Sequence, residues 1–170
     1  EFDEAAPHCE GVRLLWFGHG VNQPSLDRVL PDLQEYPLRV VSNFPGAIPW
    51  SKEILLHELD RADIVIMPAT EPYKSANRTV EAIRRGCFVV AEPHPAIQNI
   101  PGIWIGNIKE GIEVAKRNTA EARQRTAIAQ RYVSDRYAPL RIAQLWRTAI
   151  EGNAKNVAAS TIRDEVPAGA

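Results

Sequence analysis

A predicted helix in the middle of the chain begins with an unusual concentration of polar and basic residues. Its first turn holds Lys74, Ser75, Ala76, Asn77 and Arg78. A helix N-terminus presents unpaired N–H groups and about half a positive charge, so a cation there is unfavourable by a few tenths of a kcal/mol. Lys74 and Arg78 therefore indicate that an anion is bound, and the set suits a dianionic group such as diphosphate. The simpler alternative is a solvated first turn that Ser75 caps.

Glu81 lies one turn beyond Arg78 on the same predicted helix. A carboxylate at this position can accept hydrogen bonds from the two hydroxyl groups of a ribose. It can also form a surface pair with Arg78 or Arg84, worth only about 0.3 kcal/mol. Taken alone, Glu81 is more simply an ordinary helix residue.

A short glycine-containing loop, Gly18-His19-Gly20, directly follows an apolar run. Residue 23 is Gln where the dinucleotide-binding fingerprint needs Gly, and no GKS or GKT follows for a P-loop. The functional interpretation is that the glycines let the backbone approach a ligand, while His19 and Asn22 offer side-chain donors. The alternative is a tight turn without a ligand.

Another loop, FPGAIP at residues 44–49, is apolar for a segment that faces solvent. Phe44 and its neighbours form either a wall for a planar base or a loop folded back onto the core. Trp50 follows this loop directly, whereas the other three tryptophans lie in predicted strands or helices, where core packing is the default. Trp50 is therefore the tryptophan to examine for ligand stacking.

The elements that must position these residues alternate regularly. Strands are predicted at residues 12–17, 38–42, 63–69, 87–91 and 103–105, and helices at 25–36, 51–62, 75–85 and 108–118, with two more helices after them. Such alternation predicts parallel strands joined by right-handed crossovers. The fold class is therefore a doubly wound, Rossmann-like α/β domain of about five or six strands with helices on both faces. Ligands on such sheets bind outside the carboxyl ends of the strands, which directs attention to the loops after Phe17, Ser42, Ala69 and Ala91.

Composition excludes several classes of protein. The 170 residues are about one domain, and 20 basic against 21 acidic residues give a net charge of -1, so no global field attracts nucleic acid or an anionic membrane. Two cysteines are too few for a disulfide framework and indicate a reducing compartment. No apolar run approaches the ~20 residues of a membrane span, and the acidic start is unlike a signal peptide. These features predict a cytoplasmic protein without a transmembrane segment.

The four histidines are scattered, and the chain has no HExxH or CxxC motif, so neither a metal site nor a cofactor is expected. His94, between two prolines after the fourth predicted strand, is the histidine that has a route to the candidate site.

The stretch LHELDRADIVIMPATEPYKSANRTVEAIRRGCFVVAEPHPAI resembles the donor-binding, C-terminal half of GT-B glycosyltransferases of the group 1, family 4-like type. The similarity runs from about Val12 to Ile150. In that family a strand written roughly aDi-v-P, here residues 62–68, leads to a helix whose glutamate is followed by Ala and later by Gly. Those residues are Glu81, Ala82 and Gly86. The resemblance implies that Glu81 binds the ribose of a nucleotide sugar and that residues 74–78 contact its diphosphate.

One part of the family pattern is absent. Retaining members often carry a second glutamate eight positions before the first, followed by Gly, whereas this chain has Tyr73 and Lys74 there. The nearest acid is Glu71. The contacts to the sugar, and whether the anomeric configuration is retained or inverted, stay open at this point.

The resemblance also implies an organisation. A GT-B enzyme has two such domains facing a cleft, with the acceptor glycan, lipid or protein on the first, and this chain corresponds to the second. We expect residues 1–11 to be an N-terminal extension or a linker from a missing N-terminal half, 12–154 the donor-binding domain and 155–170 a flexible tail. A UDP-sugar or GDP-sugar is the expected substrate, and Lys74 and Arg78 would stabilise the leaving diphosphate without a metal. The isolated domain is expected to be inactive.

Two other classes compete with this interpretation. One is a noncatalytic nucleotide-binding or protein-binding module that keeps a degenerate GT-B half, which an unrelated upstream domain in the parent gene would favour. The other is a flavodoxin-like or receiver-like domain. Receivers need paired acids at the end of the first strand, and here that strand ends Trp16-Phe17-Gly18.

Overall fold

The computed structural model describes residues 4–163, with side chains for residues 4–151. Six parallel strands form one sheet in the order β3-β2-β1-β4-β5-β6. The predicted Rossmann-like α/β fold is thereby confirmed. The strands are β1 (Leu14–Phe17), β2 (Leu38–Ser42), β3 (Ile48–Pro49), β4 (Ile64–Met67), β5 (Phe88–Ala91) and β6 (Trp104–Ile105). The helices are α1 (Gln23–Val29), α2 (Lys52–Arg61), α3 (Asn77–Arg84), α4 (Ile108–Arg117), α5 (Thr119–Tyr137) and α6 (Pro139–Arg163).

The central strands are buried at every position, which explains their continuous apolar runs. β1, β4 and β5 contain no exposed residue, because helices cover both faces of the sheet. β1 pairs with both β2 and β4, so the strand order reverses next to β1. The loops after β1 and β4 therefore border the crevice in which ligands of this fold bind.

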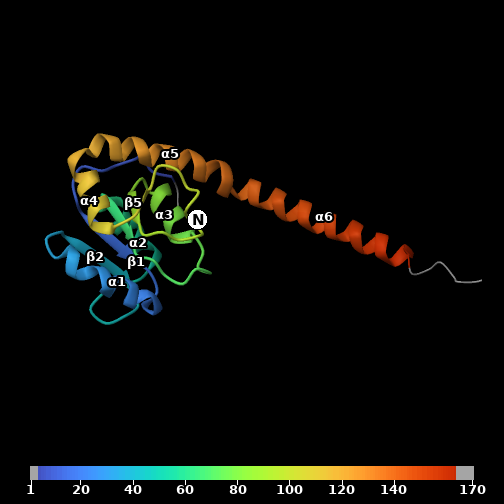
Figure 1. Cartoon of the computed structure of the whole chain (residues 1–170), viewed down its shortest axis with the longest axis horizontal. Helices are drawn as coiled ribbons and strands as arrows, with labels where there is room; N and C mark the ends of the chain where they lie inside the picture. The colour runs from blue at the N-terminus through green and yellow to red at the C-terminus, as the bar shows by residue number, and fades with distance from the viewer. Residues whose placement is uncertain (1–3, 164–170) are drawn as a thin grey trace, which may run out of the picture. The chain divides into compact units, whose positions relative to one another are not determined.

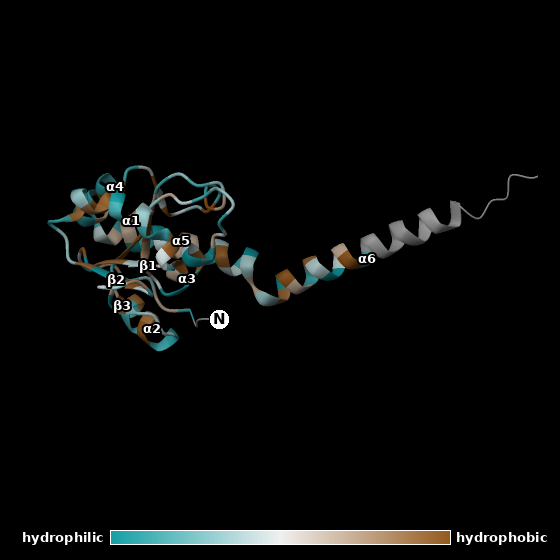
Figure 2. Cartoon of the chain, turned by 90° about the horizontal axis from the view of Figure 1, so that it is seen from below, coloured by the Kyte–Doolittle hydropathy of each residue, from teal (hydrophilic) through white to brown (hydrophobic). Residues whose placement is uncertain are grey.

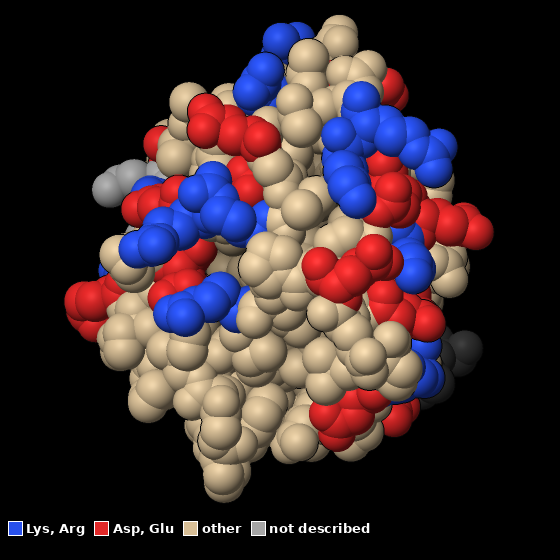
Figure 3. Space-filling view, turned by 90° about the vertical axis from the view of Figure 1, so that its left-hand side faces the viewer, with Lys and Arg blue, Asp and Glu red and all other residues tan. Residues whose placement is uncertain are grey.

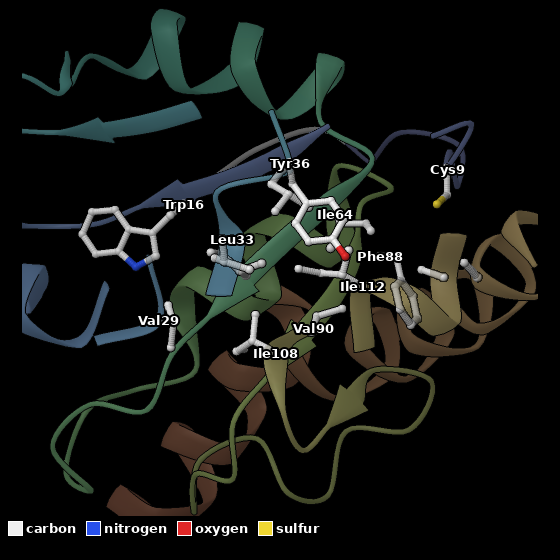
Figure 4. Packing of buried hydrophobic residues seen from close by; sticks show 14 of the residues in the cluster. Cys9, Trp16, Val29, Leu33, Tyr36, Ile64, Phe88, Val90, Ile108 and Ile112 are labelled. Atoms are coloured by element: carbon white, nitrogen blue, oxygen red, sulfur yellow. The ribbon is translucent and has the colours of Figure 1, made fainter. Parts of the chain in front are cut away.

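Alternate strand residues supply two separate packing faces. On one face the strand residues Trp16, Ile64 and Val90 pack with residues of α1 and α4 (Figure 4). Figure 2 shows α1 and α4 on one side of the strands and α2 on the other. The buried residues of α2 and α3 include Leu59 and Ile83. Buried residues of α3 thus pack this helix against the sheet, next to β5 (Figure 1).

Two predicted helix starts were wrong. α1 begins at Gln23 rather than at Ser25, whose hydroxyl lies inside the helix and donates to the Asn22 carbonyl at 2.7 Å. The predicted continuation to residue 36 is broken at Pro31, because proline lacks the N–H that an α-helix needs, and a short 3₁₀ helix (Leu30–Leu33) follows. α3 begins at Asn77 with Ala76 as its N-cap.

Ser75 therefore does not cap α3, contrary to the simpler alternative considered for this turn. Ala76 has φ −78° and ψ 4°, so the helical backbone starts two residues after Ser75, and no side chain caps it. By contrast, Ser51 caps α2 as predicted, since its hydroxyl oxygen accepts from the Ile54 N–H at 3.2 Å.

The described chain divides into two compact units between Val133 and Ser134. In the first, Ala5 donates its N–H to the Arg84 carbonyl at 2.8 Å and Cys9 is fully buried, so this stretch of the predicted linker packs on the domain. In the second, α6 extends to Arg163 through part of the predicted tail. Residues 1–3 and 164–170, at the ends of the predicted linker and tail, lie outside the described residues.

Surface charge and sequence hydropathy add two observations. Basic and acidic side chains are interspersed on the face shown in Figure 3, which fits the net charge of -1. Within residues 4–163, no helix combines the length and the apolar character that crossing a membrane requires.

Candidate functional site

A cavity of about 390 Å³ opens at the carboxyl ends of the strands, where the strand order reverses. Four residues predicted for the site line it together: Gly18, His19, Arg78 and Glu81. The remaining lining residues are Phe17, Asn43, Trp50 and Leu55. The cavity therefore joins the loop after β1, the segment after β2 and the first turns of α3.

Arg78 is held in a fixed position under the loop that follows β1. Its Nη1 donates to the Phe17 carbonyl at 3.0 Å, and its guanidinium lies 5.9 Å from the centre of the Trp16 ring. A Cβ on Gly18 would lie 2.8 Å from Nη1, so a side chain at position 18 would displace the guanidinium. Burial lowers the pKa of Arg78 from its ordinary value. A desolvated cation of this kind interacts strongly with an anion that reaches it.

Glu81 is half-buried at the same cavity. Burial raises the pKa of its carboxyl, and the positive charge of Arg78 opposes that effect. Among residues 4–151, none donates a hydrogen bond to this carboxylate, and Arg78 forms no ion pair with it. Its oxygens are consequently available to accept hydrogen bonds from a ligand.

His19 lines the cavity but is engaged in the structure of its own loop. Its Nδ1 accepts from the Val21 N–H at 3.2 Å, and its Nε2 lies 3.0 Å from Asn43 Nδ2. Asn43 in turn accepts from the Gly20 N–H at 2.7 Å. Gly20 and His19 thus shape the loop, while Asn22 is the N-cap of α1 and lies outside the cavity lining.

A smaller hollow of about 30 Å³ lies beside the cavity, and Arg78 lines both. Its wall includes four further polar residues: Thr70, Ser75, Thr79 and His94. The His94 Nδ1 accepts from the Ala96 N–H at 3.1 Å, so its Nε2 carries the proton and donates to the Glu71 carbonyl at 3.0 Å.

The other predicted residues of the α3 turn lie outside the large cavity. Ala76 is the N-cap, Asn77 is exposed at the first helical position, and the Lys74 Nζ lies 5.4 Å from the centre of the Tyr73 ring. Lys74 lines neither hollow.

The two aromatic residues near the segment after β2 differ in their surroundings. Phe44 is packed on Trp16, with ring centres 6.2 Å apart, and it lies outside the cavity lining. Trp50 is 58% exposed and lines the cavity. Asn43 and Leu55 were not predicted, although Asn43 directly follows a strand whose carboxyl end was expected to border the site.

A second cavity, of about 230 Å³, lies at the opposite, amino ends of the strands. Two of its arginines are already paired: Arg13 with the buried Asp63 at 2.8 Å, and Arg39 with Glu58 at 2.8 Å. Across residues 4–151, no group of three or more His, Cys, Asp and Glu side chains is arranged to hold a metal ion.

Comparison with known proteins gives a structural likeness. No protein-family model and no curated protein matches the sequence. The chain is similar to the crystal structure of Anabaena Alr3699/HepE in complex with UDP and glucose, with a TM-score of 0.58 and 14% sequence identity. The likeness shows the fold. It covers 85% of this chain and 42% of HepE, so this chain spans less than half of that protein's length.

Proposed function

We propose that this domain binds a nucleoside diphosphate sugar as the donor-binding half of a GT-B glycosyltransferase. The observation that carries the proposal is the placement of Arg78 and Glu81. One turn apart on α3, they line one cavity at the reversal of strand order, together with Gly18. The complex of HepE with UDP and glucose, on a similar fold, supports this class of ligand.

The roles follow from charge and hydrogen-bonding capacity. Glu81 accepts from the ribose diol, because its carboxylate has acceptor capacity that the described side chains leave unused. Arg78 and the N-terminus of α3 bind the diphosphate. No side chain caps α3, so the N–H groups of its first turn remain available for phosphate oxygens. Lys74, farther out beside Tyr73, contributes long-range attraction rather than a direct contact.

The chemistry of this half is electrostatic. When the bond between sugar and diphosphate breaks, negative charge grows on the leaving oxygens, and Arg78 with the α3 N-terminus stabilises it. In the proposed enzyme, a second domain would hold the acceptor glycan, lipid or protein. The domain alone is therefore expected to bind the donor and to transfer nothing.

Calorimetric titration with UDP, GDP and UDP-glucose tests the proposal. We expect saturable binding of one diphosphate, weakened about tenfold or more by Arg78→Lys and by Glu81→Gln, since each loses about 1.4 kcal/mol or more of ligand contact. Arg117→Lys and Glu110→Gln are matched controls, because both residues are exposed on α4. No binding at millimolar ligand, or binding that neither Arg78→Lys nor Glu81→Gln weakens, would contradict the assignment and favour a noncatalytic module.

A further inference from the structure

We infer that Trp50 is the residue that holds the nucleobase, by stacking its indole against the planar ring of the base. The inference rests on the proposed function and extends it to a residue that determines how the ligand is oriented. It is carried by the exposure of Trp50, its fixed backbone and the distribution of polar groups around the cavity.

Trp50 is an exposed tryptophan in the wall of a largely apolar cavity. Its side chain is 58% exposed and shares the cavity wall with Phe17 and Leu55. Trp16, by contrast, is fully buried in the core. A large aromatic surface left open inside an apolar hollow is typical of a binding site for a flat, weakly polar group.

The backbone around Trp50 is fixed on both sides. The Trp50 N–H donates to the Ser42 carbonyl at 3.2 Å, extending the pairing of β3 with β2. The next residue, Ser51, caps α2. Trp50 thus sits between a strand and a helix rather than on a free loop, and this preorganisation reduces the entropy lost on binding.

The polar groups determine which end of the ligand faces Trp50. Arg78 lines both the cavity and the small hollow that contains Ser75 and Thr79, so the phosphates are assigned to that side. Trp50 belongs to the cavity but not to the hollow. The base, joined to the phosphates through the ribose, is therefore assigned to the Trp50 side. Phe44 is not available for this role because it packs on Trp16.

The test compares Trp50→Phe and Trp50→Ala with the wild-type chain, using UDP, GDP, UDP-glucose and ribose 5-phosphate, which has no base. Stacking of a base on an aromatic ring contributes about 1–3 kcal/mol, so Trp50→Ala should weaken the better-bound of UDP and GDP by about five- to 150-fold. Trp50→Phe should keep most of that affinity. Binding of ribose 5-phosphate should be unchanged in both variants, and Trp146→Ala, at another exposed tryptophan, is the matched control.

Tryptophan fluorescence gives a second readout that a purely structural role would not move. UDP or GDP should quench the emission of the wild-type chain and leave that of Trp50→Phe nearly unchanged, because stacking quenches the indole it touches.

Four outcomes would overturn the inference. If Trp50→Ala binds UDP and GDP normally while Glu81→Gln does not, the inference fails and the proposed function stands. If only UDP-glucose is weakened, Trp50 contacts the sugar instead of the base. Equal weakening of every ligand, ribose 5-phosphate included, would show that Trp50 supports the fold. If the wild-type chain binds neither nucleotide, the proposed function fails, and the inference fails with it.

Discussion

Two acidic side chains at opposite ends of the sheet have contrasting environments. Asp63, next to the amino end of β4, is fully buried and accepts four hydrogen bonds at 2.8–3.0 Å, from the N–H groups of Glu10 and Arg13 and from two nitrogens of the Arg13 guanidinium. Glu81, at the carboxyl end, is half-buried, and the described residues donate no hydrogen bond to it.

The pKa values of the two carboxyls move in opposite directions. Burial alone would raise the pKa of Asp63, but the hydrogen bonds from Arg13 and from the Glu10 and Arg13 backbones outweigh burial and lower it to about 2. Burial raises the pKa of Glu81. A buried carboxylate whose acceptors are filled stabilises the fold, whereas one left unfilled in a cavity is a candidate for ligand binding. Asp63 thus marks the structural end of this sheet, and Glu81 marks the end where we propose that the donor binds.

The largest expected effect on stability comes from replacing Asp63, whose carboxylate accepts four hydrogen bonds. Asp63→Asn removes the charge that Arg13 and two backbone N–H groups face, so we expect a loss of about 3 kcal/mol in the free energy of unfolding. Urea denaturation measures it. Asp27→Asn, at an exposed position of α1, should stay within about 0.5 kcal/mol of the wild type. A loss below about 1 kcal/mol for Asp63→Asn would contradict a stabilising role for the hydrogen bonds that Asp63 accepts.

Lowering the pH should also remove the contribution of Asp63 to stability, because its carboxylate becomes protonated. The folded-state pKa of Asp63 is about 2 and its reference value is 3.8, so its contribution to stability is present above about pH 4 and is lost as the pH falls towards 2. Thermal unfolding between pH 5 and 2 should show a smaller decline for Asp63→Asn than for the wild type. Parallel declines would assign the acid sensitivity to other groups.

Gly18→Ala tests the close approach of the loop after β1 to Arg78. The new Cβ would lie 2.8 Å from Arg78 Nη1, so the guanidinium must move away from the Phe17 carbonyl. We expect a loss of about 1–2 kcal/mol in stability and weaker binding of UDP. Gly11→Ala is a control at the other end of the sheet, where the Cβ would make an ordinary 3.4 Å contact with Asp63. Equal effects of the two substitutions would remove the special role of Gly18.

Glu81→Gln should have the smallest effect on stability, and of the opposite sign. Since the folded-state pKa of Glu81 is raised, ionising it costs stability as the pH rises through the unfolded value and up to the folded one. Glu81→Gln should therefore unfold at the same or a slightly higher temperature than the wild type at pH 7, with the difference vanishing near pH 4. A clear destabilisation at pH 7 would show that Glu81 has partners within the fold.

The sequence predicted the sheet because its central strands are unbroken apolar runs, a pattern that burial on both faces requires. It did not predict β3, since a two-residue edge strand ending in Pro49 carries no periodicity. That omission also affected the site. Trp50, whose N–H extends the pairing of β3 with β2, lines the cavity, whereas Phe44 packs on Trp16. This difference arises from tertiary packing.

For α3, residue types alone indicated an anion site, but not which side chains face it. Arg78 and Glu81 line the cavity because they are one helical turn apart. Lys74 and Asn77 lie outside the cavity lining, because Lys74 precedes the helix and Asn77 is exposed at its first position.

The most direct test of the proposed donor site is the map of amide chemical shifts as UDP is added to the ¹⁵N-labelled chain. We expect the amides of residues 18–20 and 77–81 and the indole N–H of Trp50 to shift together and to saturate at one UDP per chain. The amides of Glu10 and Arg13, which face Asp63, should remain in place. Shifts concentrated at the Asp63 end, or none at millimolar UDP and GDP, would contradict the assignment of the functional end of the sheet.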